Sequence, residues 1–394
     1  MTRRRASSKT TPPEAPARIV PVSVLTGFLG SGKTTVLNHL IQQPALRRTL
    51  VLINEFGEIG LDHDLVTQAQ DDVVIAMSSG CLCCTIRGDL ATTLSEAPAR
   101  FARNGKTWFD RVVIETTGLA DPAPILHTLM TEPTLARLYR LDGVITTVDA
   151  MHSSDTLDRQ IESVKQAAVA DRLLLTKADL AAVGTLATLQ RRLRALNPAA
   201  PQIVAEHGVV DPASLFDAGL YNPRTKSLDV QRWLNAEAYP PPDHQHATTG
   251  HDANHGHGHH QSHHHNDVNR HDQHIKALCL TIDKPIPSYV VDLWFEALLM
   301  LRGPDFLRIK GILNVAGLGA PMVIHGVQHI FHPPIMLQAW PSEDRRSRIV
   351  FITRNIDESA LRDTLKMFTE ECDQPSLHPD VSGDDDIALF EARG

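Results

Sequence analysis

Short apolar runs alternate with stretches of helical periodicity over the first half of the chain. The runs are rich in Val, Ile and Leu and comprise residues 19–25, 50–53, 73–77, 112–114, 144–148 and 173–175. Helical patterns lie between several of them, at residues 90–102, 123–130, 161–169 and 186–196. Continuous apolar strands that alternate with helices are typical of a mainly parallel sheet covered on both faces. We therefore expect an α/β domain here.

The pattern changes after about residue 222. Residues 240–274 are mostly Pro, Asp, Asn, Gln and His, which is the composition of a linker or a disordered insertion. Apolar periodicity resumes at Ile275. Strand-like runs then occur at residues 278–282, 307–312, 322–327 and 349–352, and helical patterns at 288–301 and 358–368. These elements predict a second, smaller α+β domain.

Length supports this division, because 394 residues exceed what one hydrophobic core usually organises. We predict a disordered tail at residues 1–17, a first domain at 18–225, a linker with a His-rich insert at 226–274, a second domain at 275–372 and an acidic tail at 373–394. The formal net charge of -8 argues against a nucleic-acid binder that relies on a general basic field. No apolar run reaches the roughly 18 residues of a membrane span, and no secretory signal follows the Arg-rich start. We expect a cytoplasmic protein without membrane contact.

A phosphate-binding motif lies at the first strand–helix junction. Residues 27–34 read Gly-Phe-Leu-Gly-Ser-Gly-Lys-Thr and match G-x-x-x-x-G-K-[ST]. Glycines let backbone N–H groups converge on phosphates, and the start of a helix favours an anion. Lys33 would reach the β- and γ-phosphates, and the Thr34 hydroxyl would bind Mg²⁺. The alternative is a glycine-rich turn without a ligand, which the strand–helix context disfavours. The predicted nucleotide-binding residues here are Gly27, Gly30, Ser31, Gly32, Lys33, Thr34 and Thr35.

Two further segments follow in the order expected of such a domain. The apolar run at 112–114 ends in Glu115 and leads to Gly118, which resembles a Walker B strand with a γ-phosphate-sensing glycine. Glu115 alone would be better explained as a chance carboxylate at a strand end. Thr176-Lys177-Ala178-Asp179 resembles the guanine-specificity element N-K-x-D, with Thr in place of Asn. An Asp can accept hydrogen bonds from the ring N–H and 2-amino groups of guanine, which adenine lacks, so we expect GTP.

The cysteines indicate metal binding. Of five cysteines, Cys81, Cys83 and Cys84 form a C-x-C-C motif directly after the run at 73–77. Thiolates suit Zn²⁺ or Cu⁺, and three ligands leave a fourth position open for loading and release. The alternative is that these cysteines pack as small hydrophobic residues. Glu58 and His63 are candidate additional ligands, although each alone is better explained as a solvated loop residue.

Histidines gather in the insert. Many of the 21 histidines of the chain lie at 244, 246, 251, 255, 257, 259, 260, 263, 264, 265, 271 and 274. Neutral imidazoles bind Zn²⁺, Ni²⁺, Cu²⁺ or Co²⁺. A stretch this polar cannot bury a core, so we expect a flexible metal-gathering arm, with a tolerated low-complexity linker as the alternative.

Taken together, these segments resemble the CobW-like metallochaperone GTPases, a branch of the P-loop GTPases. The resemblance rests on T-G-F-L-G-S-G-K-T-T at 26–35, N-E-F-G-E at 54–58, S-G-C-L-C-C-T at 79–85, E-T-T-G-L-A-D-P at 115–122 and T-K-A-D at 176–179. R-I-K-G at 308–311 and H-G-V-Q-H at 325–329 resemble the C-terminal domain of that family. The resemblance implies a metal site near GTP and metal delivery to a client protein, with zinc as the commonest cargo.

Three functional hypotheses remain open. The first is a GTP-hydrolysing zinc chaperone with GTP and Mg²⁺ as ligands and Lys33, Thr34 and Glu115 as catalytic residues. The second is a metal-insertion factor for a cobalt (cobalamin) pathway or for nitrile hydratase, with Co²⁺ or Ni²⁺ in place of Zn²⁺. The third is a metal-storage protein whose nucleotide site is regulatory. The sequence does not identify the client, and a homo-oligomer is possible.

Overall fold

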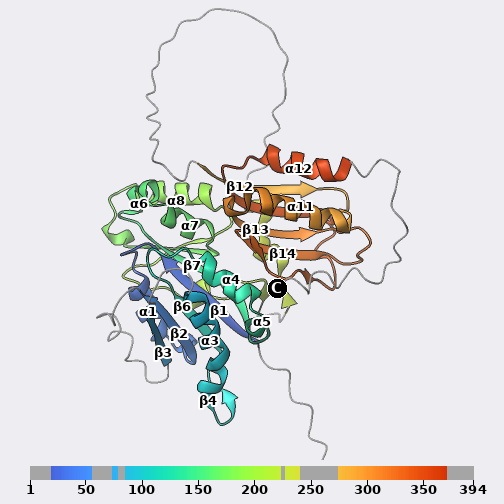
Figure 1. The fold of residues 1–394 in the computed structure, drawn as a ribbon. Coiled ribbons are helices and arrows are strands. Elements are labelled where there is room, and N and C mark those ends of the chain that lie inside the picture. The colour runs from blue at the N-terminus through green and yellow to red at the C-terminus, as the bar shows by residue number, and fades with distance from the viewer. Residues whose placement is uncertain (1–18, 56–72, 79–84, 223–226, 240–273, 371–394) are drawn as a thin grey trace, which may run out of the picture.

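The computed structural model describes residues 19–55, 73–78, 85–222, 227–239 and 274–370. The predicted tails, almost all of the His-rich insert, and Glu58, His63, Cys81, Cys83 and Cys84 lie outside the described residues. In the described part, a parallel-sheet domain and an antiparallel-sheet domain pack side by side (Figure 1). None of the described helices is long and apolar enough to cross a membrane.

The first domain is built on a seven-stranded sheet with the order β3-β2-β6-β1-β7-β8-β9. Every pairing in this sheet is parallel, so all carboxyl ends of the strands meet at one edge. This confirms the α/β fold expected from the apolar runs. The strands are β1 (Val20–Gly27), β2 (Thr49–Glu55), β3 (Val73–Ser78), β6 (Arg111–Glu115), β7 (Tyr139–Asp149), β8 (Arg172–Thr176) and β9 (Gln202–Val204).

Helices cover both faces of the parallel sheet. On one face, α1 (Lys33–Ile41) and α9 (Pro212–Leu215) pack on side chains such as Leu25, Val51 and Val113. The other face is covered by α3 (Thr85–Arg100), α4 (Ala123–Thr131), α7 (Ile161–Ala168) and α8 (Thr185–Leu196). Shorter elements are α5 (Pro133–Leu138), α6 (Ser153–Arg159), the turns η1 (Pro44–Leu46) and η2 (Ala178–Leu180), and the paired strands β4 (Ala102–Arg103) and β5 (Lys106–Thr107).

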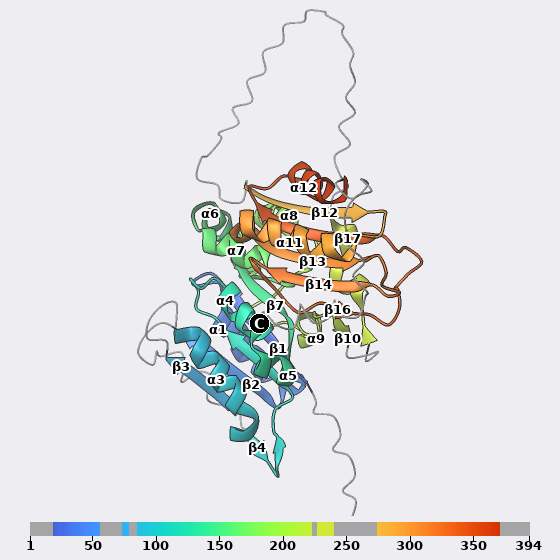
Figure 2. The same ribbon diagram turned by 45° about the vertical axis from the view of Figure 1, so that its right-hand side comes forward.

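The second domain has an antiparallel sheet with the order β12-β17-β13-β14-β15, and β16 also pairs with β14. Two helices, α11 (Ser288–Arg302) and α12 (Glu358–Glu370), lie together against this sheet in both views (Figures 1 and 2). The strands are β12 (Ile275–Ile282), β13 (Phe306–Leu313), β14 (Met322–Val327), β15 (Ile330–Phe331), β16 (Ile335–Met336) and β17 (Ser347–Arg354), and η5 (Gly303–Asp305) precedes β13.

Alternation along β17 explains how the two domains join. Ile349 and Phe351 face α11 and α12, whereas Ile352 packs with residues of α7 and α8 from the first domain. Because successive side chains of a strand point to opposite faces, one sheet closes its own core and also docks on its neighbour. The seam between the domains is therefore a continuous apolar contact with polar contacts beside it.

The structure differs from the predicted linker over residues 227–239. After β10 (Tyr221–Asn222) pairs with β11 (Ser227–Leu228), the chain forms α10 (Val230–Leu234) and η3 (Ala236–Ala238). Val230, Trp233 and Leu234 are buried against β13, β14 and β17 of the second domain. Their i, i+3, i+4 spacing creates one apolar face on a helix too short to be conspicuous in the sequence. The other predicted domain limits stay predictions.

Candidate nucleotide and metal site

The predicted phosphate loop joins β1 to α1 at the carboxyl edge of the parallel sheet. Gly27, Gly30 and Gly32 have φ angles of 144°, 70° and 88°, a region that side chains disfavour. A Cβ at Gly27 would lie 2.5 Å from the Thr147 carbonyl oxygen and 2.8 Å from Ser31 Oγ, whereas nothing lies within 4 Å of one at Gly30. The loop therefore needs glycine for two reasons. At Gly27 a side chain would collide with Thr147 and Ser31, and at all three positions the backbone has a positive φ.

Lys33 opens α1 and folds back over the loop. Its Nζ donates hydrogen bonds to the carbonyl oxygens of Gly27 at 2.9 Å and Phe28 at 3.3 Å. The side chain is buried, which holds one positive charge beside the backbone N–H groups at the start of the helix. A cation and a helix N-terminus at one point form a site for an anion such as a phosphate chain.

Thr34 and Glu115 meet next to Lys33. Thr34 Oγ1 donates a hydrogen bond of 3.0 Å to Glu115 Oε1, although the residues lie 81 positions apart. Glu115 ends β6, and its buried position at the carboxyl edge follows from the pairing of Leu25 with Glu115 between β1 and β6. A hydroxyl and a carboxylate oxygen are hard ligands of the kind that Mg²⁺ uses beside nucleotide phosphates. The donor set here fits that ion.

The segment after Glu115 passes directly over the phosphate loop. A Cβ at Gly118 would lie 2.7 Å from both the Cα and the backbone nitrogen of Leu29. Gln166, on α7 and fully buried, donates to the carbonyl oxygens of Gly118 at 3.2 Å and Ala120 at 3.0 Å. Gln166 thus positions the segment predicted to sense the γ-phosphate. Sequence reasoning missed it, because a single Gln in an amphipathic helix carries no recognisable signal.

The predicted guanine element lies on the other side of the loop. Thr176, at the end of β8, donates from its Oγ1 to the Ser31 carbonyl oxygen at 2.8 Å. Lys177 has a φ of 54°, which turns the chain into η2, where Asp179 lies 3.7 Å from His207 Nδ1. A Thr in the Asn position of the motif therefore still reaches the loop.

Asp149 is a second site residue that sequence reasoning missed. Its Oδ2 accepts hydrogen bonds from Lys177 Nζ at 2.8 Å and pairs with His152 Nδ1 at 3.1 Å. Burial acts to raise the pKa of Asp149, but the hydrogen bonds from Lys177 and His152 outweigh it and hold that pKa below its ordinary value. A cavity of about 220 Å³ lies between Asp149, Lys177 and loop residues 28–31. The available signal was an apolar strand ending in an acid, as at Glu115.

The predicted metal residues Cys81, Cys83, Cys84 and Glu58 lie outside the described residues, but the sheet fixes where their segments attach. Ile53 of β2 pairs with Glu115 of β6, and Glu55 pairs with Ser78 of β3. The described strands therefore lead into both segments at the edge that carries the phosphate loop. In the described part of the chain, no group of three or more His, Cys, Asp or Glu side chains could hold a metal.

The second domain contacts the site through the turn between β14 and β15. Gln328 Nε2 donates to Asp121 Oδ2 at 3.0 Å, and Lys165 Nζ donates to the same oxygen at 3.1 Å. On α4, which follows Asp121, His127 Nε2 lies 2.8 Å from the Val327 carbonyl oxygen. The segment that passes over the phosphate loop is thus held by both domains.

These features define a P-loop nucleoside triphosphatase domain: a glycine-rich strand–helix loop, a buried lysine over it, and a hydroxyl beside a strand-end carboxylate. The chain belongs to the CobW/HypB/UreG family, whose nucleotide-binding domain matches residues 21–204. The cobalamin synthesis protein cobW C-terminal domain matches residues 275–369. The resemblance inferred from the motifs is confirmed.

Individual relatives are similar over most of their length. Zinc chaperone YjiA of Escherichia coli (strain K12) is 31% identical over 343 residues, covering 87% of this chain and 96% of the relative. Zinc chaperone CobW of Pseudomonas aeruginosa is 29% identical over 379 residues, covering 88% of this chain and 91% of the relative. A crystal structure of Zn(II)-bound YjiA GTPase from E. coli superposes with a TM-score of 0.62 at 26% identity, covering 89% of this chain and 99% of that one.

Proposed function

We propose that this protein is a GTP-hydrolysing metallochaperone that carries zinc to a client protein. One observation supports this most directly: β2 and β3, the strands that come before Glu58 and before the C-x-C-C motif in the sequence, both end at the edge that carries the phosphate loop. Nucleotide chemistry and metal binding would then share one edge of one sheet. Relatives named as zinc chaperones, and a zinc-bound GTPase of the same fold, support the same function.

The nucleotide would be held mainly by backbone groups. The loop N–H groups at Gly30, Ser31 and Gly32 would bind the phosphates, and Lys33 would leave the Gly27 carbonyl to contact the β- and γ-phosphates. Thr34 and Glu115 would hold Mg²⁺, which neutralises phosphate charge when bound. Asp179 would read guanine, while Thr35, Thr176 and Lys177 complete the binding surface. Gly118 would approach the γ-phosphate, because it lies against Leu29 of the phosphate loop.

The metal would be cargo. Cys81, Cys83 and Cys84 would supply three thiolates, with Glu58 as a further ligand, and an open coordination position would permit transfer to the client. The GTP-bound form would order the segments around the loop and present the metal. Hydrolysis would then change their arrangement and release it. The contact of Gln328 with Asp121 gives the second domain a direct path to this change.

The test is metal-dependent GTP turnover in the full chain. We expect Zn²⁺ to change the turnover of the wild type, and we expect a Cys83→Ala, Cys84→Ala double variant to lose both this response and tight zinc binding. Cys279→Ala is a matched control, because Cys279 lies half-buried on β12, away from the parallel sheet edge. If the double variant keeps the zinc affinity and response of Cys279→Ala, the proposal is wrong.

The same assay separates the alternatives. A panel of Zn²⁺, Co²⁺ and Ni²⁺ would favour a cobalt-pathway factor if Co²⁺ gave clearly the largest response. The His-rich composition of residues 243–274 favours a second candidate, a metal-storage protein with a regulatory nucleotide site. Deletion of these residues should abolish metal tolerance in cells if storage is the function. A chaperone should keep part of its activity.

A further inference from the structure

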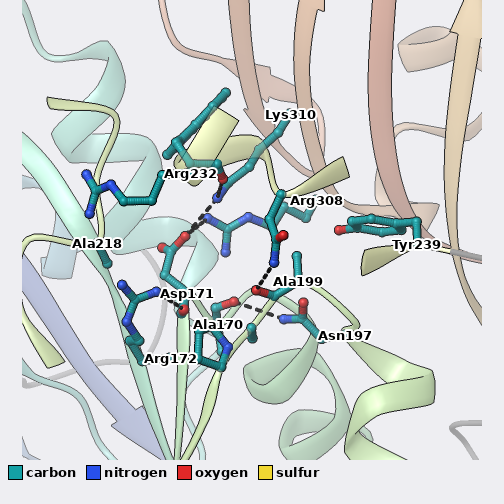
Figure 3. Close-up of a pocket in the computed structure, with 14 residues that line it drawn as sticks. Ala170, Asp171, Arg172, Asn197, Ala199, Ala218, Arg232, Tyr239, Arg308 and Lys310 are labelled. Atoms are coloured by element: carbon teal, nitrogen blue, oxygen red, sulfur yellow. Dashed lines mark hydrogen bonds and ion pairs between the residues drawn. The ribbon is translucent and has the colours of Figure 1, made fainter. Parts of the chain in front are cut away.

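A second polar site lies at the amino end of β8, opposite the phosphate loop. Asp171, directly before β8, accepts hydrogen bonds at its Oδ1 from Arg308 Nη2 at 2.6 Å and Lys310 Nζ at 2.9 Å. Both cations extend from β13 of the second domain toward this carboxylate (Figure 3). The proposed GTPase cycle uses none of these side chains.

These residues line a cavity of about 250 Å³ between the domains, which we call the seam cavity. Its charged lining consists of Asp171 and four cations, Arg172, Arg232, Arg308 and Lys310, which leaves an excess of three positive charges. Asp229, just outside the lining, reduces this excess by pairing loosely with Arg232, at 3.6 Å from Nε. Asp171 bonds to Arg308 and Lys310, and its charge also acts on Arg172, so one carboxylate in the lining is shared among three cations.

The buried positive charge is incompletely compensated. Arg308 Nε is buried and has no hydrogen-bond partner among the described residues, which is unusual for a guanidinium in a protein interior. Burial, together with the neighbouring Arg308, lowers the pKa of Lys310 to about 8. Burial, together with Arg232, also lowers the pKa of Arg172. Burial therefore disfavours the positive charge of Lys310 and of Arg172, and a bound anion would relieve that cost.

We propose that the seam cavity binds a small oxyanion of the phosphate class, held by Arg172 and Arg232 from one side and by Arg308 and Lys310 from the other. The planar guanidinium group matches two oxygens of such an oxyanion with paired N–H donors. The cavity is smaller than the roughly 300–1,000 Å³ of sites for drug-sized ligands, so the ligand is a small ion or a small phosphomonoester. A bound oxyanion would connect β8 of the first domain to β13 of the second and strengthen their docking.

The test is a titration of the full chain with inorganic phosphate at fixed ionic strength, in which calorimetry measures the binding. The full chain is first loaded with Mg²⁺ and a non-hydrolysable GTP analogue, which occupies the phosphate loop and its γ-phosphate position. We expect saturable binding of one phosphate, and we expect Arg172→Gln and Arg232→Gln each to weaken it about ten-fold, the loss of one charge-assisted hydrogen bond. Arg159→Gln is the matched control, because Arg159 pairs with Asp155 on the exposed face of α6.

The partly exposed Arg232 keeps the test decisive if Arg172→Gln fails to fold, since Arg232 bonds mainly to carbonyl oxygens of Asp217 and Gly219 at the surface. Competition by a small phosphomonoester would show that the site accepts esters, whereas no competition would restrict the ligand to free phosphate. The proposal is overturned if the loaded wild type shows no saturable binding. It is equally overturned if Arg232→Gln binds phosphate as tightly as Arg159→Gln.

Discussion

The two ends of strand β8 carry sites that are built in opposite ways. At the carboxyl end, Thr176 bonds to the backbone of a glycine-rich loop, and the neighbouring donors are main-chain N–H groups with one lysine. At the amino end, Asp171 meets long charged side chains from another domain, 137 and 139 residues away. The first site is built around one contiguous loop, whereas the second exists only where the two domains dock.

This difference predicts different responses to mutation. A backbone site keeps its shape when one of its side chains is removed, so such a change costs chemistry more than stability. Mutation of a buried ionic cluster instead lowers stability, because removing one member leaves the remaining charge buried without a partner. Variants at the phosphate-loop edge should therefore lower the rate of GTP hydrolysis, and variants at the seam should lower the free energy of unfolding.

Asp171→Asn should give the largest effect. The amide keeps the size of the side chain and an acceptor for the Val144 N–H, which now bonds to Asp171 Oδ2 at 3.0 Å. It removes the negative charge that both Arg308 and Lys310 require, so we expect a loss of about 3–5 kcal/mol in the free energy of unfolding. Urea denaturation measures it, and Asp155→Asn, in an exposed pair, should change stability by less than about 1 kcal/mol. Equal effects of the two variants would contradict a distinctive role for the seam.

The difference in stability between the wild type and Asp171→Asn should also depend on pH. Burial acts to raise the pKa of Asp171, but Arg308 and Lys310 outweigh it and hold that pKa far below the ordinary value of an aspartate. A carboxyl group with a depressed pKa stabilises the fold above its unfolded pKa of about 3.9 and loses that contribution as pH falls further. The stability difference between wild type and Asp171→Asn should therefore be constant near neutral pH and shrink below about pH 4. A difference independent of pH would show that Asp171 acts by packing alone.

Lys33→Ala, at the phosphate-loop edge, should have the next largest effect. Removing one preorganised group that stabilises the charge of a transition state lowers kcat by a factor of about 10²–10³. Stability should change little, because the hydrogen bonds of Lys33 Nζ to the carbonyl oxygens of Gly27 and Phe28 can be replaced by bonds to water. Steady-state GTP turnover and urea denaturation on the same preparation separate the two quantities. Lys106→Ala is the control, because Lys106 is exposed on β5. A large loss of stability in Lys33→Ala would contradict the difference proposed between the two ends of β8.

The sequence indicated the phosphate-loop edge of the sheet more clearly than the seam, for a physical reason. The phosphate loop is contiguous, and its chemistry requires glycines, Lys33 and Thr34 at fixed spacing, so the motif can be recognised without the fold. Glu115 could be identified because strand ends in a parallel sheet share one edge. Gln166 required the fold, since only packing brings α7 against the segment over the loop. Asp149, like Glu115, ends an apolar strand, and that signal was overlooked.

The second domain shows the limit of periodicity. Its strands and helices were predicted from apolar runs, but nothing in residues 308–311 indicates that Arg308 and Lys310 turn toward Asp171. An Arg and a Lys two positions apart on a strand are ordinarily interpreted as a solvated face. Burial by another domain reverses that interpretation, and α10 went unpredicted for the same reason.

Gly118→Ala should have an intermediate effect that tests the contact above the phosphate loop. The added methyl group would meet the backbone of Leu29 at 2.7 Å, so the segment or the loop must shift, at a cost of about 1–3 kcal/mol. We expect the cost to appear mainly as weaker GTP binding or slower turnover. Gly319→Ala is the control, because nothing lies within 4 Å of a Cβ there. Unchanged GTP affinity and turnover in Gly118→Ala would mean that this contact is absent when nucleotide is bound.

Gln328→Ala should have the smallest effect, and it tests whether the second domain influences the nucleotide site. Gln328 donates one hydrogen bond to Asp121, which keeps its bonds from Lys165 and the Ala123 N–H, so we expect a loss of only about 0.5–1.5 kcal/mol in the free energy of unfolding. Gln231→Ala, exposed on α10, is the control.

The rate of GTP hydrolysis then decides what the contact does. If the turn between β14 and β15 only docks the domains, Gln328→Ala lowers stability and leaves turnover unchanged. If the second domain holds the segment from Glu115 to Asp121 for catalysis, turnover changes several-fold, and combining the variant with Lys165→Ala gives less than the sum of the two separate effects, because both side chains act through the same oxygen of Asp121. Unchanged turnover in Gln328→Ala would assign Gln328 to docking alone, whereas additive effects of the two variants on turnover would show that Gln328 and Lys165 do not act through the same oxygen of Asp121.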